Sequence, residues 1–321
     1  MRILVIGAGS IGCRHIKNLN RLGYKDIDVA DPDANEERLK SLEIKNVYAD
    51  FKDAVESKKY DAAFVCTPPV YHVPIASYLA KKGIDLFIEK PLSNSLRGVD
   101  ALIRLKNKNK LVVMVGYNQR FNYGIRRIKS LIDSGALGRK LYYIRAEVGS
   151  YLPNWRPGRD YRKNYTARRE LGGGIILDAS HEIDYTLWLS GSRVVDVKAI
   201  YDKVSNLKTN VEDLAEIIMR FENGIIASVH LDMVSRSYSR ECKAVGEKGH
   251  AKWIFAEDAL ETYTGRGKPL VRKHELDPNQ SYVDELKHFI NCIKRRSNPE
   301  SNFETARETL KVVMKIKSKR G

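Results

Sequence analysis

The chain opens with MRILVIGAGSIGCRH, residues 1–15, in which an apolar run leads directly into a glycine motif. The run predicts a β-strand, and residues 11–22 predict an amphipathic helix. Gly7, Gly9 and Gly12 form a GxGxxG pattern between them. Gly7 allows a tight turn, Gly9 lets a pyrophosphate approach the backbone, and Gly12 lets the helix pack close to the sheet. A strand, a glycine turn and a helix in this order indicate a dinucleotide-binding βαβ unit.

The residues around this turn indicate how a dinucleotide would bind. The helix begins at Ser10 and Ile11, where free N–H groups and the helix dipole favour phosphate. Asp31 follows the second predicted strand, about 20 residues after the motif, where an acid accepts hydrogen bonds from the adenosine ribose. Because a carboxylate repels a 2′-phosphate, we predict NAD as the cofactor. NADP is the alternative, since Arg38 would weaken this preference if it folded back toward the ribose.

The pattern of predicted elements changes near residue 120. Before it, short apolar runs alternate with helical stretches, which is typical of a parallel sheet. After it come longer strands with period-two alternation, and Asn223-Gly224 is a strong hairpin signal. We therefore predict an α/β protein with two domains. Residues 1–120 form a Rossmann domain with a doubly wound parallel sheet. Residues 121–321 form an α+β domain with a large, mostly antiparallel open sheet, whose last helix packs back on the first domain.

These predictions rest on individual elements. In the first domain the strands are expected at residues 2–6, 28–30, near 47, 62–66, 85–88 and 111–115, and the helices at 11–22, 35–42, 74–82 and 95–106. In the second, strands are expected at 141–148, 194–201, 214–221, 225–234, 241–245 and 251–255, and helices at 125–134, 175–189, 282–294 and 305–316.

Composition narrows the class of protein. No apolar tract reaches the roughly 20 residues that a membrane span needs, and a strand at the first residues leaves no room for a secretion signal, so we expect a cytoplasmic protein. The net charge is +16, but the lysines are dispersed among acids, which favours a solvated surface over nucleic-acid binding. Four scattered cysteines predict neither a disulfide framework nor a metal site.

Two polar clusters follow strands of the first domain, at the sheet edge where open α/β sheets bind ligands. The first is Cys66-Thr67-Pro68, with His72 close behind, and the second is Glu89-Lys90-Pro91. Together with the glycine motif they resemble the Gfo/Idh/MocA family, named for glucose–fructose oxidoreductase and inositol dehydrogenase. The resemblance continues through GYNQRF at residues 116–121 and GGGIILD at residues 172–178. It implies a nicotinamide cofactor contacted by a set of residues after the strands: Thr67, Pro68, His72, Glu89, Lys90 and Asn118.

The resemblance also implies the catalytic residues. Lys90 is the active-site lysine that hydrogen-bonds the reacting oxygen, Asp178 binds substrate hydroxyls, and His181 is the proton acceptor. We expect Asp178 and His181 on one face of a single helix over residues 175–189, behind three glycines that let the chain approach a ligand. Many relatives place the histidine four residues after the acid rather than three, which leaves the division of roles between Lys90 and His181 open. The structural alternative is a capping aspartate and a packed core histidine.

The segment 151–170 is aromatic and basic and leads into the three glycines. Arginine binds carboxylate or phosphate through two parallel hydrogen bonds, so an anionic sugar such as a uronate, a sugar phosphate or a nucleotide sugar is one interpretation. A solvated loop whose arginines pair with acids of the other domain is the other. We expect substrate contacts, besides those of Lys90, Asp178 and His181, from Arg120, Trp155, Arg156 and Tyr165.

The predicted function is hydride transfer between a nicotinamide and a CH–OH group of a sugar or sugar derivative, by an NAD(P)-dependent dehydrogenase. The alternatives are an NAD-dependent glycosidase of the same family and a non-catalytic dinucleotide-binding regulator. The expected partner is a small molecule, without nucleic acid, membrane or bound metal. Because the second sheet has a face left over, with Ile218, Val229 and Leu231 suited to either side, we expect a homo-oligomer, either a dimer or a tetramer.

Overall fold

The computed structural model describes residues 1–34, 36–265 and 267–318. The chain divides into two compact units, each built from two pieces of sequence. The first contains Met1–Asn118 and Tyr282–Arg307, and the second contains Gln119–Ser281 and the chain from Glu308 onward. From the sequence we predicted a single domain boundary near residue 120. That prediction did not separate the segment 282–307, which folds with the first unit.

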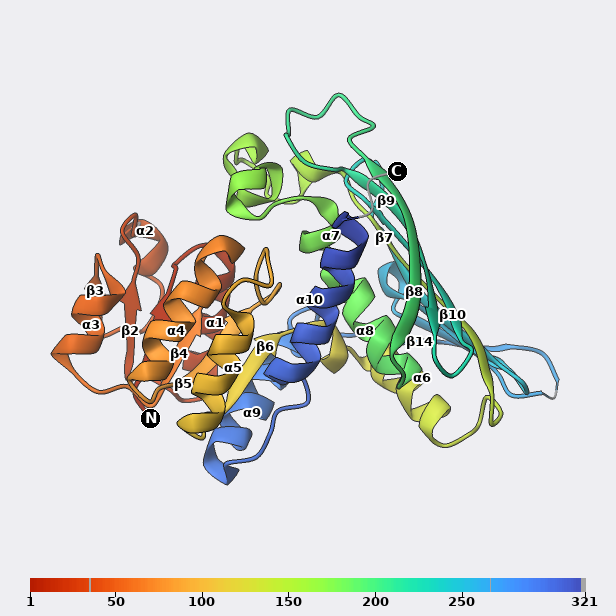
Figure 1. Cartoon of the computed structure of the whole chain (residues 1–321), viewed down its shortest axis with the longest axis horizontal. Coiled ribbons are helices and arrows are strands. Elements are labelled where there is room, and N and C mark those ends of the chain that lie inside the picture. The colour runs from red at the N-terminus through yellow and green to blue at the C-terminus, as the bar shows by residue number, and fades with distance from the viewer. Residues whose placement is uncertain (35, 266, 319–321) are drawn as a thin grey trace. The chain divides into compact units, whose positions relative to one another are not determined.

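The first unit is built on a parallel sheet of six strands in the order β3-β2-β1-β4-β5-β6. Figure 1 shows these strands in red to yellow. The sheet extends in both directions from β1, which is the strand order of a doubly wound fold. The strands are β1 (Ile3–Ile6), β2 (Ile27–Ala30), β3 (Asn46–Tyr48), β4 (Ala62–Val65), β5 (Asp85–Glu89) and β6 (Val113–Gly116). The Rossmann prediction is confirmed.

Most helices of the first unit begin and end near the predicted residues. The helix over Phe51–Ser57 was not predicted, and two others differ from their predicted bounds in an informative way. The helices are α1 (Ser10–Arg21), α2 (Glu36–Leu39), α3 (Phe51–Ser57), α4 (His72–Lys81), α5 (Val99–Lys108) and α9 (Gln280–Arg295). The predicted helix 95–106 starts only at Val99, because its N-cap Gly98 has a left-handed backbone with φ 79°. The predicted start of the second helix, Asn35, lies outside the described residues. The observed helix α2 ends at Leu39, whereas the predicted helix ends at Leu42.

The C-terminal segment 282–307 is joined to the first unit by specific contacts. The N–H of Val115 in β6 donates to the carbonyl of Ser301 at 2.9 Å. Arg296 pairs with the buried Asp85 at 2.5 Å, and Lys106 pairs with Glu304 at 2.7 Å. These bonds explain why the segment folds with the first unit. The last helix, α10 (Phe303–Ser318), begins in the first unit and ends in the second.

The second unit contains an eight-stranded sheet in the order β14-β13-β12-β11-β7-β10-β9-β8. All its pairs are antiparallel except β7 with β10, so the predicted mostly antiparallel sheet is confirmed. Figure 1 shows β8, β9 and β10 as long ribbons in green. The strands are β7 (Leu141–Gly149), β8 (Val194–Asp202), β9 (Leu214–Phe221), β10 (Ile226–Asp232), β11 (Ser239–Gly246), β12 (His250–Ile254), β13 (Ala259–Tyr263) and β14 (Leu270–Lys273).

Helices cover one face of this sheet. The helices are α6 (Tyr123–Asp133), α7 (Ile175–Asp178) and α8 (Ser180–Ser190). α8 packs against β7 and β10, and α6 packs against β12, where a side chain on Gly124 would overlap the ring of Trp253. Val229 and Leu231 point to the covered face and are fully buried, whereas Ile218 is exposed. No helix among the described residues is both long enough and apolar enough to cross a membrane.

Candidate active site

The glycine turn of the first unit has the shape that a pyrophosphate requires. Gly7 has φ +94°, and a Cβ there would lie 2.8 Å from the carbonyl oxygen of Cys66. A Cβ on Gly12 would overlap the carbonyl oxygen of Gly7, so the start of α1 packs on the turn itself. At Gly9, by contrast, a Cβ would meet no described heavy atom within 4 Å. The three glycines therefore hold a tight turn and leave space at the N-terminus of α1, where phosphate binds best.

Asp31 lies at the end of β2, next to this turn. Its Oδ2 accepts a hydrogen bond from the N–H of Ala8 at 2.5 Å, and its Oδ1 accepts one from Asp33 at 2.8 Å. Arg38 folds back to the same turn, where Nη1 donates to the carbonyl of Ala8 at 3.0 Å. Asp31 and Arg38 thus hold opposite sides of one peptide segment, and both groups that bear on the choice between NAD and NADP lie at the turn.

His72 links the two polar turns that follow β4 and β5. Its Nδ1 lies 2.8 Å from the carbonyl oxygen of Pro91, and its Nε2 lies 2.7 Å from that of Thr67. The ring is fully buried, and burial lowers the pKa of His72 while the carbonyl acceptors oppose that shift. The sequence predicted a cofactor contact for His72. The structure shows that the His72 side chain connects the turn at Thr67 with the turn after Lys90. The Lys90–Pro91 peptide bond in that second turn is cis.

The remaining cofactor residues lie around the same sheet edge. Glu89 and Asn118 are buried, and Oε2 of Glu89 accepts a hydrogen bond from the N–H of Lys90 at 3.2 Å. The hydroxyl of Thr67 is buried and has no hydrogen-bond partner among the described residues. Buried hydroxyls nearly always have a partner, so this group is suited to a bound molecule. The open space at Gly9 and the hydroxyl of Thr67 both fit a dinucleotide.

In the second unit, Asp178 is held by the segment that precedes it. The hydroxyl of Tyr165 donates to Oδ1 at 2.9 Å, and the hydroxyl of Thr166 donates to Oδ2. Asp178 and His181 are 8% and 9% exposed. The prediction that both lie on one continuous helix is wrong. Ala179, with φ −92° and ψ 27°, separates Asp178 at the end of α7 from His181 in the first turn of α8.

The three glycines before α7 serve the packing of the loop. A Cβ on Gly173 would overlap the carbonyl oxygens of Tyr165 and Thr166, and one on Gly174, which has φ +110°, would overlap the carboxylate of Glu212. The sequence predicted that these glycines bring the chain close to a ligand. In the structure Gly173 allows close packing on the loop that carries Tyr165 and Thr166, and Gly174 allows close packing on Glu212. Their approach to a ligand stays a prediction.

Arg120 is part of a buried ion pair that the sequence did not indicate. Its Nε and Nη2 donate to the two carboxylate oxygens of Asp184, both at 2.7 Å, and Thr309 donates to Oδ1 of the same acid at 3.0 Å. The side chains are 3% and 1% exposed. Glu182 forms a similar buried pair with Arg240 at 2.6 Å. The two acids, Glu182 and Asp184, on helix α8 after the three glycines were the only sequence signal for these pairs. The predicted substrate contact of Arg120 stays a prediction.

The basic segment 151–170 folds as four short 3₁₀ turns: η3 (Leu152–Asn154), η4 (Tyr161–Lys163), η5 (Tyr165–Ala167) and η6 (Arg169–Leu171). Two of its arginines pair inside the segment, Arg162 with Asp160 at 2.8 Å and Arg168 with Glu170 at 3.9 Å. The guanidinium of Arg156 lies over the ring of Tyr165, 5.9 Å from its centroid. Trp155 donates its indole N–H to the carbonyl of Ser150 at 3.1 Å.

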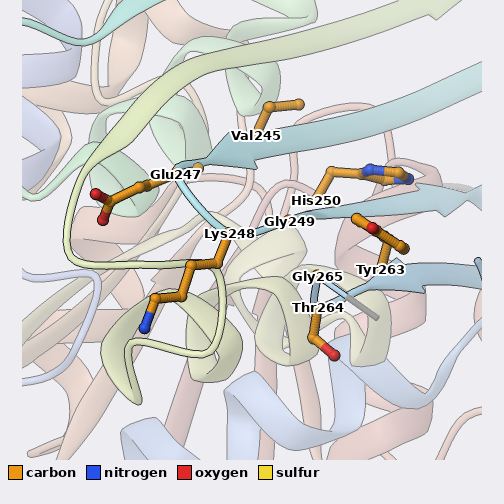
Figure 2. Close-up of a pocket in the computed structure, with 9 residues that line it drawn as sticks. Val245, Glu247, Lys248, Gly249, His250, Tyr263, Thr264 and Gly265 are labelled. Atoms are coloured by element: carbon orange, nitrogen blue, oxygen red, sulfur yellow. The ribbon is translucent and has the colours of Figure 1, made fainter. Parts of the chain in front are cut away.

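A surface pocket of the second unit lies elsewhere. It is formed by Val245–His250 and Tyr263–Gly265, where β11 and β12 join and β13 ends (Figure 2). The N–H groups of Glu247 and Lys248 donate to the carbonyls of Lys140 and Leu137, so the turn is bonded within the protein. None of the residues predicted to bind cofactor or substrate lines this pocket.

Both halves of the chain match one family. The model of an oxidoreductase family with an NAD-binding Rossmann fold matches residues 1–117, and the model of the GFO/IDH/MocA C-terminal domain matches residues 125–252. The myo-inositol 2-dehydrogenase of Thermotoga maritima is 29% identical over 329 residues, which cover 97% of this chain and 93% of the relative.

Solved structures show the same fold along the whole chain. Levoglucosan dehydrogenase in complex with NADH has a TM-score of 0.89 at 18% identity, over 99% of this chain and 96% of that one. The UDP-N-acetylglucosamine 3-dehydrogenase of Acidithiobacillus ferrooxidans has a TM-score of 0.81 at 23% identity, over 99% and 97% of the two chains. With both family models matched in order, the chain belongs to the Gfo/Idh/MocA oxidoreductases, and its N-terminal domain is an NAD-binding Rossmann domain.

Proposed function

We propose that this protein is an NAD-dependent dehydrogenase that oxidises a CH–OH group of a polyol or cyclic sugar. The observation that carries this proposal is the glycine turn, where Gly9 leaves space above α1 and Asp31 stands at the end of β2. Bound there, the cofactor supplies the hydride acceptor. The protein supplies position and electrostatics for the reaction.

In this proposal Lys90 hydrogen-bonds the reacting oxygen of the substrate and exchanges its proton. The position is held from two sides, since Glu89 accepts from the N–H of Lys90 and His72 bonds the carbonyl of Pro91. These bonds fix the backbone from which the Lys90 side chain extends. Such positioning is what general acid–base catalysis requires, because the proton must be within hydrogen-bond reach.

Asp178 binds substrate hydroxyls, and His181 is the second group that exchanges a proton. An ionised carboxylate has about four acceptor positions, so it accepts from the hydroxyls of Tyr165 and Thr166 and from a substrate together. The break at Ala179 gives Asp178 and His181 separate helices. Their relative placement therefore depends on the break at Ala179 and not on an uninterrupted helical repeat.

The relatives support a polyol or sugar as the substrate class. They include a myo-inositol 2-dehydrogenase and a levoglucosan dehydrogenase, both named for cyclic, hydroxyl-rich compounds. The second candidate is an anionic sugar, favoured by the arginines of segment 151–170 and by the relative that acts on a UDP-sugar. Arg162 and Arg168 pair inside the segment, whereas Arg156 and Arg159 form no ion pair among the described residues.

One double variant distinguishes an anionic from a neutral substrate by its effect on KM. Replacing Arg156 and Arg159 with glutamine raises KM for a uronate or a nucleotide sugar by about tenfold or more, because charge-assisted hydrogen bonds each contribute roughly 1.5–3 kcal/mol. KM for a neutral inositol stays unchanged. The matched control is Arg162→Gln, which removes an arginine already paired with Asp160. If the double variant and the wild type had the same KM for the uronate or nucleotide sugar, the anionic substrate would be rejected.

The function itself is tested by following NAD and NADP reduction against inositols, free sugars, uronates, sugar phosphates and nucleotide sugars. Net NADH formation with a polyol or sugar supports the dehydrogenase and excludes the glycosidase, which recycles its cofactor. Tight NAD binding without reduction across the whole panel would contradict the proposal and favour a dinucleotide-binding regulator.

A further inference from the structure

A buried cluster of titratable groups lies inside the first unit. It is formed by His15 in α1, Glu89 at the end of β5 and Glu285 in α9, which are 0%, 7% and 0% exposed. Nε2 of His15 lies 2.5 Å from Oε1 of Glu89. One nitrogen or oxygen atom from each of the three side chains lies within 4.8 Å of the others. No role in the proposed reaction has been assigned to His15 or Glu285.

The surroundings of the cluster are mostly apolar. The ring of His15 lies 5.8 Å from that of Phe64, 5.0 Å from that of Phe87 and 6.4 Å from that of Tyr282, measured between centroids. Walls of this kind stabilise net charge poorly. The cluster therefore has to balance its own charge.

The nearby titratable groups include two cations, Arg14 and Lys90, but the charge that acts on Glu285 is the negative one of Glu89. Burial, together with Glu89 and Glu285, raises the pKa of the Cys66 thiol, so it stays neutral. Burial likewise raises the pKa of Tyr282, although Arg14 and Lys90 oppose this shift. The guanidinium of Arg14 lies 4.4 Å from the centroid of the Tyr282 ring. The negative charge that must be neutralised is that of the two glutamates.

Two ionised glutamates and a neutral histidine would leave two negative charges in this apolar environment. One proton shared between His15 and Glu89 removes one of these charges, and a proton on the remaining carboxyl group removes the other. Glu89 has two polar partners, since Oε1 lies 2.5 Å from Nε2 of His15 and Oε2 accepts from the N–H of Lys90. Neither carboxyl oxygen of Glu285 has a hydrogen-bond partner among the described residues. The second proton therefore belongs on Glu285.

We propose that His15, Glu89 and Glu285 form a buried proton-holding site, in which His15 and Glu89 share one proton across their 2.5 Å contact and Glu285 carries a second. Burial raises the pKa of Glu285 well above its usual value, and the negative charge of Glu89 adds to the shift. The site holds the Glu89 carboxylate where it receives the N–H of Lys90, which makes His15 and Glu285 positioning residues for Lys90. This last link rests on the proposed function, whereas the protonation does not.

A divalent cation would also neutralise two glutamates, but the geometry favours protons. His15 and Glu89 are in direct hydrogen-bond contact at 2.5 Å. A metal-ligating histidine almost always donates its other ring N–H to a neighbour. Nδ1 of His15 has no such partner among the described residues. A metal site is therefore an outcome of the test that would overturn the proposal.

The test compares the pH dependence of unfolding in wild type and Glu285→Gln, without cofactor or substrate. A carboxyl whose folded pKa is raised stabilises the protein below its unfolded pKa, and this contribution is lost as pH rises toward the folded pKa. Between about pH 5 and pH 8, the unfolding equilibrium constant of wild type relative to E285Q should rise by up to about tenfold per pH unit, equivalent to one proton. Titrations elsewhere in the protein cancel in this ratio.

Asp28→Asn is the matched control, because Asp28 is fully buried in the same unit but has partners. Lys58 lies 2.7 Å from its carboxylate, and Tyr60 and Asn46 donate at 2.6 Å and 2.8 Å. These hydrogen bonds outweigh burial and lower the pKa of Asp28. The ratio of wild type to D28N is therefore flat over the same pH range. A flat ratio for E285Q as well would overturn the proposal.

Infrared spectroscopy of the wild type tests the protonation directly, even if E285Q is too unstable to study. At neutral pH we expect the C=O stretch of a protonated carboxyl group, absent in E285Q where that variant folds. The absence of this band from the wild type, or a stoichiometric metal in the purified wild type that chelators remove, would overturn the proposal.

The link to Lys90 has its own readout. Replacing His15 with asparagine should move the pH profile of kcat while NAD affinity, measured by calorimetry, stays unchanged. An unmoved profile would remove the link to Lys90, whereas the unfolding and infrared results would still decide the protonation. If the wild type had no activity, the proposed function would fail, but those two results would stand.

Discussion

The phenol hydroxyl of Tyr165 donates a hydrogen bond to Oδ1 of Asp178 over 2.9 Å, which ties the basic segment 151–170 to the end of α7. Because this bond orients the carboxylate, we expect Tyr165→Phe to raise KM for the substrate by about tenfold, the value of one charged hydrogen bond. Steady-state kinetics measures the effect. Tyr161→Phe, which removes a hydroxyl bonded to the N–H of Lys208 instead, is the control and leaves KM unchanged. A KM equal to that of wild type in Tyr165→Phe would show that Asp178 does not depend on this bond.

The buried pair of Arg120 and Asp184 predicts a large loss of stability when one partner is removed. Asp184→Leu leaves an uncompensated guanidinium and should cost about 3–5 kcal/mol in the free energy of unfolding. The double variant Arg120→Met with Asp184→Leu should recover most of this loss, since an apolar pair needs no charge partner. Urea denaturation gives both values. A double variant as unstable as the single one would mean that the pair is not the source of the effect.

We expect the protein to lose stability in alkaline solution, because His230 then loses the proton that its two acidic partners stabilise. A hydrogen bond with Asp232 and a second with Glu216 raise the pKa of His230 to about 9. Because the folded pKa lies above the unfolded value of about 6.5, the contribution is complete below that value and is lost as pH rises to about 9. His230→Gln should remove this part of the pH dependence, as followed by thermal unfolding. A variant with the same alkaline decline as wild type would contradict the assignment.

We expect Asp31 to determine the preference for NAD over NADP. Asp31→Ser removes the carboxylate that would bind the ribose hydroxyls, so NAD affinity should fall by about tenfold or more. It also removes the repulsion of a 2′-phosphate beside Arg38, so the ratio of NADP to NAD affinity should rise. Calorimetry with both dinucleotides measures this ratio. Asp33→Asn, two residues away, is the control. An unchanged ratio in Asp31→Ser would place the ribose elsewhere.

Much of the fold was predictable because its signals are local. The strand, glycine turn and helix of residues 2–22 follow from apolar periodicity and from the conformational freedom of Gly7. The mostly antiparallel second sheet follows from period-two alternation and from hairpin signals such as Asn223-Gly224. The parallel pairing of β7 with β10 joins strands that are far apart in sequence, so no local turn signal predicts this pairing.

The candidate site was predictable only in part. The resemblance located Lys90, Asp178 and His181, but the break at Ala179 follows from tertiary packing that propensity does not encode. The partners of Asp178 and the role of the three glycines depend on how the loop folds back on α7. The cluster of His15 with Glu285 joins residues 270 positions apart in the chain, which no spacing rule connects.

Lys90 is the residue on which the proposed reaction depends most. The variant Lys90→Met keeps the length of the side chain but removes its proton-exchanging group. The expected loss in kcat is about 100-fold or more, the usual contribution of general acid–base catalysis. Lys108→Met, at an exposed position of α5, is the matched control and should behave as wild type.

The most direct measurement is therefore NADH formation by wild type and Lys90→Met with the best polyol or sugar of the panel, alongside calorimetric NAD binding. We predict that both proteins bind NAD and that only the wild type reduces it at an appreciable rate. A Lys90→Met variant that reduces NAD as fast as wild type, or a wild type that fails to bind NAD, would contradict the account.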